Sequence, residues 1–220
     1  MMMIDLALVK SKLFTSVISD ALDSIGVRNQ AMRPFVRPLD DNAVMAGFAR
    51  TGLYAVRFHA APEENPYEVE IALVDDLRPD DVAVFACHGP TERIAPWGGL
   101  LTTAAVYRRA AGCVTDGLAR DVKQIRALGF PVFCGGIGPI DSKGRGMMVE
   151  KDGLVECAGV RVETGDLVFG DADGVVVVPK AMTGQVIEAA LRKVEAERHT
   201  SEELSRGAPL AKVFARYGIL

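Results

Sequence analysis

The chain has 220 residues, a formal net charge of −4 and four cysteines. Its 49% hydrophobic and 25% charged residues are typical of a globular domain and exclude a disordered or collagen-like chain. The net negative charge gives no basic surface for nucleic acid or anionic lipid, and no apolar run approaches a membrane span. The mean hydropathy of +0.18 is slightly apolar, which suggests subunit interfaces.

The cysteines predict core packing rather than a metal or redox site. Cys87, Cys113, Cys134 and Cys157 are widely spaced, contain no C-x-x-C motif and stand beside apolar or small residues. The first residues lack the basic segment and cleavage site of a signal peptide. Free thiols without a signal peptide favour a reducing, cytoplasmic location.

The first quarter of the chain predicts a helix followed by extended segments. Apolar residues recur at helical spacing in Thr15–Ile25. Arg33–Asn42 contains two prolines and reads as an extended linker. Val44–Ala49 and Leu53–Phe58 are expected to form two short strands, separated by Thr51-Gly52.

The middle of the chain alternates between short apolar runs and helical patterns. The expected order is helix Tyr67–Val74, strand Val82–Ala86, loop Cys87–Pro96, helix Gly98–Ala111, strand Cys113–Thr115, connection Asp116–Arg120, helix Asp121–Leu128, strand Pro131–Cys134 and a glycine-rich loop, Gly135–Gly146. This alternation predicts a layered α/β domain.

The last third is rich in short β runs and ends in helices. The expected strands are Leu154–Cys157, Val160–Val162, Leu167–Gly170 and Val175–Val178, with Asp173-Gly174 as a hairpin signal. A long charged helix, Ala181–Leu204, and a final helix, Ala208–Tyr217, follow. The sequence therefore predicts a single domain over residues 1–220 with a C-terminal helical extension from about residue 181. The charges of the long helix fit either a solvated face or an interface.

Several catalytic motifs are absent. The chain has no H-E-x-x-H, no phosphate-binding P-loop, no G-x-G-x-x-G at a strand–helix junction and no G-x-S-x-G elbow. These absences weigh against zinc proteases, ATPases, dinucleotide dehydrogenases and α/β-hydrolases.

Gly98-Gly99 opens a predicted helix after the loop that ends at Pro96. Free N–H groups at a helix start attract anions, and glycine lets a ligand approach the backbone closely. The pair is therefore either a cradle for a carboxylate or phosphate, or a plain helix entry.

Arg120-Asp121 follows the strand and Asp-Gly turn at Cys113–Gly117. Ligands bind at the carboxyl ends of strands in open α/β sheets. Arginine clamps a carboxylate through a two-pronged fork, and aspartate holds a hard divalent ion. The alternative is structural, with Asp121 as the N-cap of the helix that follows.

Other polar residues are weaker candidates. The mixed-charge loop Asp141–Arg145 either closes over an anionic substrate or is simply solvated. His88 reads as a solvated loop residue. Lys123 and Lys143 lie nearest in sequence to the candidate site, but neither has the desolvating surroundings that a Schiff-base lysine needs.

Taken together, these segments resemble the RraA-like / 4-hydroxy-4-methyl-2-oxoglutarate aldolase family. The motifs, in order, are S-D-A-L-D-S-I-G at Ser19–Gly26, W-G-G-L-L at Trp97–Leu101, T-D-G-L-A-R-D at Thr115–Asp121, L-G-F-P-V-F at Leu128–Phe133, D-S-K-G-R at Asp141–Arg145 and G-D-L-V-F-G-D-A-D-G-V-V-V-V-P at Gly165–Pro179. The resemblance runs from about Thr15 to Pro179.

The resemblance implies a β/β/α layered fold of the swivelling-domain type and trimers or paired trimers with active sites at subunit interfaces. It implies a divalent metal, Mg²⁺ or Mn²⁺, and a small oxoacid substrate. By position, Gly98, Gly99, Leu100 and Leu101 match the family's substrate-binding backbone amides. Arg120 matches the arginine that contacts the pyruvate moiety, and Asp121 matches the metal-associated aspartate; these two are the expected catalytic residues.

The implied reaction is a metal-assisted lyase reaction. The metal chelates the carboxylate and keto oxygen of a 2-oxo acid and acts as a Lewis acid on the developing enolate. Loss of CO₂ from oxaloacetate and retro-aldol cleavage of 4-hydroxy-4-methyl-2-oxoglutarate both give the pyruvate enolate held by that metal. The base that starts the retro-aldol step is not assigned from the sequence.

One position departs from the family pattern. The characterised aldolases carry an acidic residue 21 positions before the arginine, and that position is Gly99 here. The change removes a carboxylate that could position water or relay a proton. A non-catalytic regulator of the RraA type, which binds a ribonuclease or helicase, is therefore the alternative function.

Overall fold

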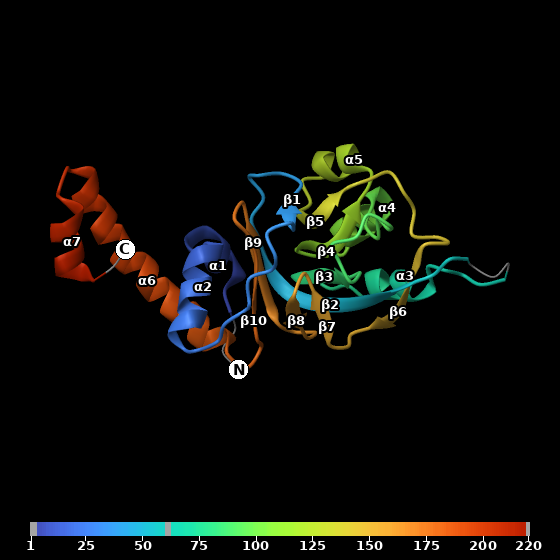
Figure 1. Ribbon diagram of the computed structural model, residues 1–220, viewed down its shortest axis with the longest axis horizontal. Helices are drawn as coiled ribbons and strands as arrows, with labels where there is room; N and C mark the ends of the chain where they lie inside the picture. The colour runs from blue at the N-terminus through green and yellow to red at the C-terminus, as the bar shows by residue number, and fades with distance from the viewer. Residues whose placement is uncertain (1–3, 60–62, 219–220) are drawn as a thin grey trace.

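The computed structural model describes residues 4–59 and 63–218. Figure 1 shows a twisted sheet carrying helices on its outer side and an arm of two C-terminal helices that extends away from it. The strands are β1 (Arg37–Pro38), β2 (Met45–Val56), β3 (Asp81–Ala86), β4 (Gly112–Ala119), β5 (Val132–Ile137), β6 (Gly146–Lys151), β7 (Val155–Cys157), β8 (Val160–Val162), β9 (Leu167–Asp171) and β10 (Gly174–Val178). The helices are α1 (Leu6–Lys12), α2 (Thr15–Ser24), α3 (Glu68–Asp75), α4 (Gly99–Tyr107), α5 (Val122–Ala127), α6 (Thr183–Ser205) and α7 (Leu210–Tyr217).

The main sheet has the order β1-β5-β4-β3-β2-β9-β10, and β6 also pairs with β2. Neighbours from β2 to β5 are parallel, whereas β9 runs antiparallel to β2 and to β10. Arg37 Nη1 donates a hydrogen bond of 2.5 Å to the carbonyl of Asp173, so the first and last strands of this order approach each other. The result is a nearly closed sheet.

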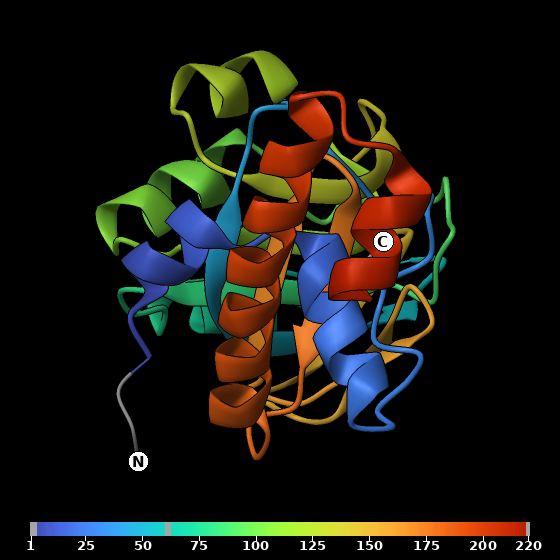
Figure 2. The ribbon, with the colours of Figure 1, turned by 90° about the vertical axis from the view of Figure 1, so that its left-hand side faces the viewer.

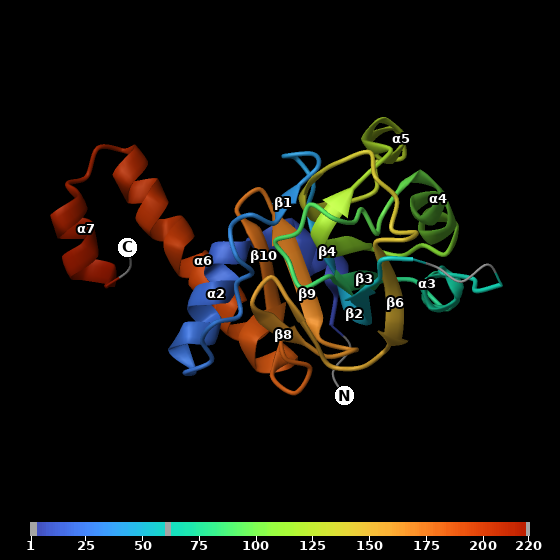
Figure 3. The ribbon, with the colours of Figure 1, turned by 45° about the vertical axis from the view of Figure 1, so that its right-hand side comes forward.

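The alternation of side chains along β3 divides the molecule into layers. Ala83 and Phe85 join the cluster that packs under α3, α4 and α5, which Figure 3 shows on one side of the sheet. Val82 and Val84 face the opposite side and pack against the small antiparallel pair β7–β8. Because successive side chains of a strand point to opposite faces, one apolar run supplies both cores. The predicted layered β/β/α fold is confirmed.

A third apolar cluster lies beneath the terminal helices. It joins α1, α2 and the first half of α6 to β9 and β10. Figure 2 shows α6 crossing this face beside α2. Farther along, α6 leaves the body, and its exposed surface carries ion pairs such as Arg192–Glu188 and Arg198–Glu195. The described part of the chain contains no helix with the length and hydropathy needed to cross a bilayer.

The two strands predicted on either side of Thr51-Gly52 are one continuous strand, β2, so that prediction is wrong. Gly52 pairs with Phe85 of β3 instead of making a turn. A Cβ at Gly52 would overlap the end of the Met148 side chain, so close packing explains the glycine.

The predicted connection Asp116–Arg120 is also wrong, because β4 continues to Ala119 and is buried throughout. The Asp116 carboxylate accepts backbone N–H groups from Cys87, Gly89 and Ala158 at 2.6, 2.8 and 3.2 Å. These three hydrogen bonds satisfy the buried carboxylate, so Asp116 lies within a strand and not in the expected connection.

Several other elements match or extend the expectations. The Asp173-Gly174 signal does mark the β9–β10 hairpin. All four cysteines are free and buried, as predicted. Helix α1 and strands β1 and β6 were not expected, and β5 reaches Ile137, inside the predicted glycine-rich loop. The division into one domain and a C-terminal extension stays a prediction.

Candidate active site

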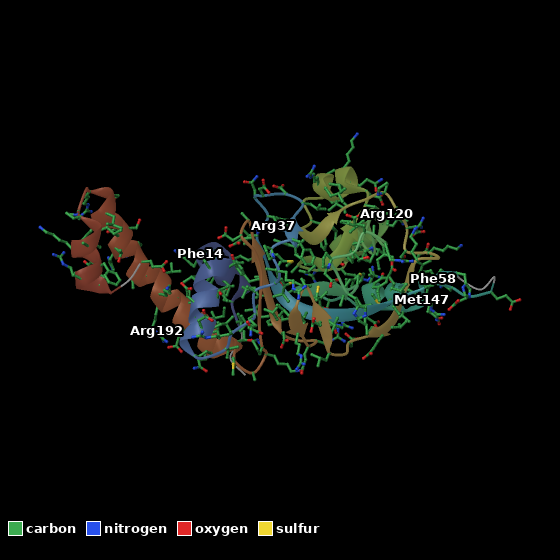
Figure 4. The ribbon with its side chains drawn as sticks, in the orientation of Figure 1. Phe14, Arg37, Phe58, Arg120, Met147 and Arg192 are labelled. Carbon is green, nitrogen blue, oxygen red and sulfur yellow. The ribbon has the colours of Figure 1, made fainter. Side chains whose placement is uncertain are left out.

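A cavity of about 410 Å³ lies between α3, the start of α4 and the loops that follow β4 and β5. Figure 4 marks Arg120 there, on the side of the molecule away from α6. Its lining residues are Tyr67, Glu70, Ile71, Ala95, Pro96, Gly98, Leu100, Leu101, Arg120, Asp121, Asp141 and Ser142. The cavity therefore collects most of the predicted site residues at the carboxyl end of β4, where α/β sheets bind their ligands.

Trp97 fixes the geometry at one wall of this cavity. Its side chain is fully buried, stacks on Phe130 and donates its indole N–H to the Thr102 hydroxyl at 2.9 Å. Its backbone bridges to Ala119, and its carbonyl accepts the N–H of Arg120 at 3.0 Å. The start of α4 and the end of β4 are thereby held side by side.

The turn after β4 is joined to α4 by one side chain. Asp121 Oδ2 accepts the backbone N–H of Gly99 at 3.0 Å. Asp121 itself adopts a left-handed backbone, with φ 57° and ψ 33°. It stands at the N-cap position of α5, but its side chain makes no capping bond to that helix. Asp121 thus occupies the N-cap position that the structural alternative expected, but its carboxylate caps the neighbouring helix α4 and not α5.

The start of α4 borders the cavity through Gly98, Leu100 and Leu101. Gly98 is its N-cap, and a Cβ there would come within 2.9 Å of Asp121 Oδ2 and 3.1 Å of Arg120 Cγ. The N–H groups of Leu100 and Leu101 precede the first intrahelical bond, which Thr102 donates to Gly98. Three of the four predicted cradle residues thus line the cavity, whereas Gly99 does not line it and directs its N–H to Asp121.

Arg120 is the cation of this cavity, and two carboxylates flank it. Its guanidinium lies 3.6 Å from Asp141 Oδ1 and 4.0 Å from Asp121 Oδ2, with 37% of the side chain exposed. Asp141 Oδ2 also accepts the Tyr67 hydroxyl at 2.6 Å. Asp141 and Ser142 of the loop Asp141–Arg145 therefore line the cavity, whereas closure of this loop over an anionic substrate stays a prediction.

These contacts set the protonation of the Tyr67–Asp141 pair. Although burial opposes ionisation of Asp141, the hydrogen bond from Tyr67 and the charge of Arg120 lower its pKa. Burial and the same hydrogen bond raise the pKa of Tyr67 to about 12. At neutral pH the pair is thus a carboxylate and a neutral phenol.

Sequence reasoning missed Glu70, a carboxyl in the cavity wall. Only 6% of this residue is exposed, and the Tyr54 hydroxyl donates to its Oε2 at 2.5 Å. Burial raises the pKa of Glu70 to about 7, although the bond from Tyr54 opposes the shift. A signal was present, because Glu70 shares helical spacing with the buried residues Leu73 and Val74.

The weaker candidates lie outside the lining. His88, Lys123 and Lys143 are all exposed, and none of them borders the cavity. Neither lysine has the desolvated surroundings of a Schiff-base lysine. The site is therefore built from Arg120, backbone amides and carboxylates.

The donor set suits a hard divalent ion shared with a substrate. No group of three or more His, Cys, Asp or Glu residues placed to hold a metal occurs within residues 4–59 and 63–218. Asp121 offers a carboxylate that is 45% exposed, and it lies at the cavity. Mg²⁺ commonly takes one or two carboxylates and completes its octahedron with water and substrate oxygens, so this single carboxylate fits it.

Comparison with known proteins agrees with this architecture. Residues 15–177 match the family model "RraA-like: Aldolase/RraA". A protein of Halalkalibacterium halodurans, named "Putative 4-hydroxy-4-methyl-2-oxoglutarate aldolase", is 36% identical over 179 residues, which cover 81% of this chain and 79% of that protein.

Two solved structures resemble nearly the whole chain. An uncharacterized protein from Pseudomonas syringae pv. tomato superposes with a TM-score of 0.86 at 25% identity, covering 98% of this chain and 96% of that one. RraAS2 of Streptomyces coelicolor, described as an unusual member of the RNase ES inhibitor RraA protein family, superposes with a TM-score of 0.75 at 26% identity. That match covers 94% of this chain and 99% of RraAS2. The chain belongs to the RraA-like (Aldolase/RraA) family.

Proposed function

We propose that the protein is a divalent-metal-dependent lyase that releases pyruvate from 2-oxo acids, by retro-aldol cleavage of 4-hydroxy-4-methyl-2-oxoglutarate, by decarboxylation of oxaloacetate, or both. One observation carries the proposal. A guanidinium, the free amides of a helix N-terminus and an accessible carboxylate converge on one cavity. Relatives named as aldolases of this substrate class support the lyase assignment.

The protein groups suit a substrate that carries a carboxylate beside a ketone. Arg120 presents a planar fork to the carboxylate of the pyruvyl moiety. The N–H groups of Leu100 and Leu101 and the positive end of the α4 dipole add fixed positive potential at the same place. Because these donors are held by the fold, they stabilise negative charge that grows on the keto oxygen as the C3–C4 bond breaks.

Asp121 is the residue that would hold the divalent ion. Mg²⁺ is the expected ion, and Mn²⁺ is the alternative. Such an ion supplies Lewis-acid polarisation of the keto group when it is bound. The hydrogen bond from Gly99 engages Asp121 Oδ2 and holds the carboxylate at the cavity. No described residue hydrogen-bonds to Oδ1, so that oxygen remains for a metal.

Assembly into a homotrimer, or a pair of trimers, with the cavity at a subunit interface is part of the same proposal. Leu100 lines the cavity yet is 85% exposed, and Tyr107 at the other end of α4 is 87% exposed. Large apolar side chains exposed beside a ligand cavity are typical of a surface that another subunit covers.

Pyruvate release with and without metal tests the proposal. The oligomer is assayed with each substrate in Mg²⁺ and again in EDTA, against a metal-only blank. Metal-dependent turnover of at least one substrate well above the blank is expected. A folded oligomer with no turnover of either would contradict the lyase and favour the regulator, which the RNase-inhibitor description of RraAS2 keeps as the second candidate.

A further inference from the structure

One side chain of the cavity wall has no role in the binding scheme above. Glu70 is buried on the inner face of α3. Its side chain has one hydrogen bond to the described residues, which Tyr54 donates to Oε2. No buried side-chain nitrogen or oxygen in the described part of the chain lacks a partner. The second oxygen, Oε1, is therefore solvent-accessible, and the cavity that Glu70 lines is where it opens.

A carboxyl at this position is costly to the fold. Its neighbours on the helix face, Leu73 and Val74, are apolar and buried. A carboxyl buried in such surroundings loses hydration that one hydrogen bond does not replace. Buried titratable groups in a cleft are typical of functional sites, and the balance of burial and the bond from Tyr54 keeps the Glu70 pKa at about 7.

We infer that Glu70 is the acid–base group of this site, a role that rests on the proposed lyase function. In the retro-aldol direction Glu70 carboxylate takes the proton of the C4 hydroxyl. The C4–O bond becomes a carbonyl, the C3–C4 bond breaks, and its electron pair passes into the pyruvate enolate. The Glu70 carboxyl then returns the proton to C3. One substrate gives two pyruvates, and the glutamate ends as it began.

The other carboxylates of the cavity are poorly suited to this work. Asp121 accepts the Gly99 N–H and is the proposed metal ligand. Asp141 lies between the Tyr67 hydroxyl and Arg120, which hold its pKa low and make it a weak base. Glu70 alone combines burial, an oxygen open to the cavity and a pKa near neutrality.

Glu70 also supplies a carboxyl that the start of α4 lacks. Residue 99 is glycine, and a Cβ there would overlap the side-chain amide of Gln124, which fills that space. The acid–base group of this chain therefore comes from α3 rather than from the first turn of α4.

Several charged or titratable groups face Glu70 from the surrounding elements. They are Tyr54 of β2, Tyr67 at the start of α3, Cys87 after β3, Arg120 after β4 and Asp141 in the loop after β5. Tyr54 and Arg120 favour the ionised form of Glu70, whereas burial and Asp141 favour the protonated form. Of these groups, Tyr54 is the one that hydrogen-bonds to Glu70. A substitution of Tyr54 should therefore shift the Glu70 pKa and, with it, the pH profile of the reaction.

Assays with the two candidate substrates distinguish an acid–base role of Glu70 from a structural one. Retro-aldol cleavage needs a base for the C4 hydroxyl proton. Oxaloacetate loses CO₂ without one, and solvent can protonate the enolate afterwards. Glu70→Gln is thus expected to lower kcat for the aldol substrate by about 100-fold or more, with KM and oxaloacetate decarboxylation within about threefold of wild type. Glu68→Gln makes the same change at an exposed position of α3 and is the matched control.

The pH dependence of aldol cleavage provides a second test of the role of Glu70. Tyr54→Phe removes the hydrogen bond that favours ionised Glu70, so the acid limb of the aldol kcat/KM profile should move to higher pH. Equal losses of both reactions in Glu70→Gln, full retention of aldol cleavage, or an unmoved limb in Tyr54→Phe would each overturn the assignment. Wild-type decarboxylation without aldol cleavage would overturn it as well. Wild-type protein that turns over neither substrate would defeat the proposed function, and the role of Glu70 with it.

Discussion

The carboxylate of Asp121 accepts the backbone N–H of Gly99 at 3.0 Å, so one side chain ties the end of β4 to the start of α4. The negative charge also lies at the positive end of the α4 dipole, where it stabilises the helix. Asp121 therefore has a structural role that can be separated by substitution from its proposed role at the metal.

Asp121→Asn makes that separation. Asparagine keeps the shape and an oxygen that can accept the Gly99 N–H, but it loses the charge. We expect the free energy of unfolding to fall by about 1 kcal/mol or less, the usual size of a charge–dipole interaction. Pyruvate release in Mg²⁺ should fall by about 100-fold or more, because a neutral amide is a poor ligand for a hard cation. Urea denaturation and a coupled pyruvate assay measure the two effects; a variant with more than a tenth of wild-type activity would argue against metal binding by Asp121.

Arg120→Lys tests the guanidinium fork. Lysine keeps the positive charge but presents a single ammonium group instead of two parallel N–H donors. We expect kcat/KM to fall by about 10- to 100-fold, mainly through a higher KM. Arg126→Lys is the control, because Arg126 bonds to the Leu39 carbonyl away from the cavity. Equal kinetics for the two variants would show that the fork makes no specific contact with the substrate.

Two glycines should respond differently to the same methyl group. A Cβ at Gly99 would meet only the flexible end of Gln124 and Asp121 Cβ at 3.2 Å, so Gly99→Ala should cost less than about 1 kcal/mol. A Cβ at Gly47 would overlap the Asp80 backbone carbonyl and come within 2.9 Å of Val82, and Gly47→Ala should cost about 1–3 kcal/mol. Equilibrium denaturation compares them, and a larger loss for Gly99→Ala would refute the packing argument.

The buried carboxyl of Glu70 makes stability depend on pH. Its folded pKa of about 7 lies above the ordinary value of 4.5, so the native state binds this proton more tightly than the unfolded state does. Below pH 4.5 the carboxyl is protonated in both states and carries no ionisation penalty. The penalty for burying the charge then grows as the pH rises from 4.5 through 7, so stability falls over that range. The gap between the two pKa values corresponds to roughly 3 kcal/mol.

Denaturation curves of wild type and Glu70→Gln at pH 5, 6, 7 and 8 measure this linkage. The wild-type free energy of unfolding should decrease relative to the variant across that range, because glutamine has no proton to lose. Parallel curves for the two proteins would mean that the Glu70 pKa is not raised. This test needs neither substrate nor metal, so it is independent of the proposed activity.

The layers of the fold followed from short-range patterns. The run Val82–Ala86 was expected as a strand, and its alternating side chains do divide between two cores. The expected elements are wrong where packing between distant segments determines the structure. Thr51-Gly52 resembles a turn locally, but Gly52 is a glycine because Met148 packs against it from a strand almost a hundred positions later.

The residues of the site likewise divide into those that local sequence predicts and those that it does not. Gly98, Arg120 and Asp121 were predictable because each stands where a loop meets a helix beside a strand end. Glu70 was missed although it shares helical spacing with the buried Leu73 and Val74, because its hydrogen-bond partner, the Tyr54 hydroxyl, lies on β2. Asp141 does not stand out from the other residues of its charged loop in the sequence, and it is the Tyr67 hydroxyl that anchors it at the cavity. Local sequence thus predicts where a strand ends, whereas partners on other elements decide which side chains reach the cavity.

The stoichiometry of pyruvate formed from 4-hydroxy-4-methyl-2-oxoglutarate by the wild-type protein in Mg²⁺ tests the proposed lyase site most sharply. Retro-aldol cleavage of this substrate yields two pyruvates for each molecule consumed. We expect that ratio, its loss in EDTA, and its loss in Arg120→Ala and Asp121→Ala proteins that remain folded. Pyruvate release that persists in both variants, or that is absent from the folded wild type for this substrate and for oxaloacetate alike, would contradict a lyase site built on Arg120 and Asp121.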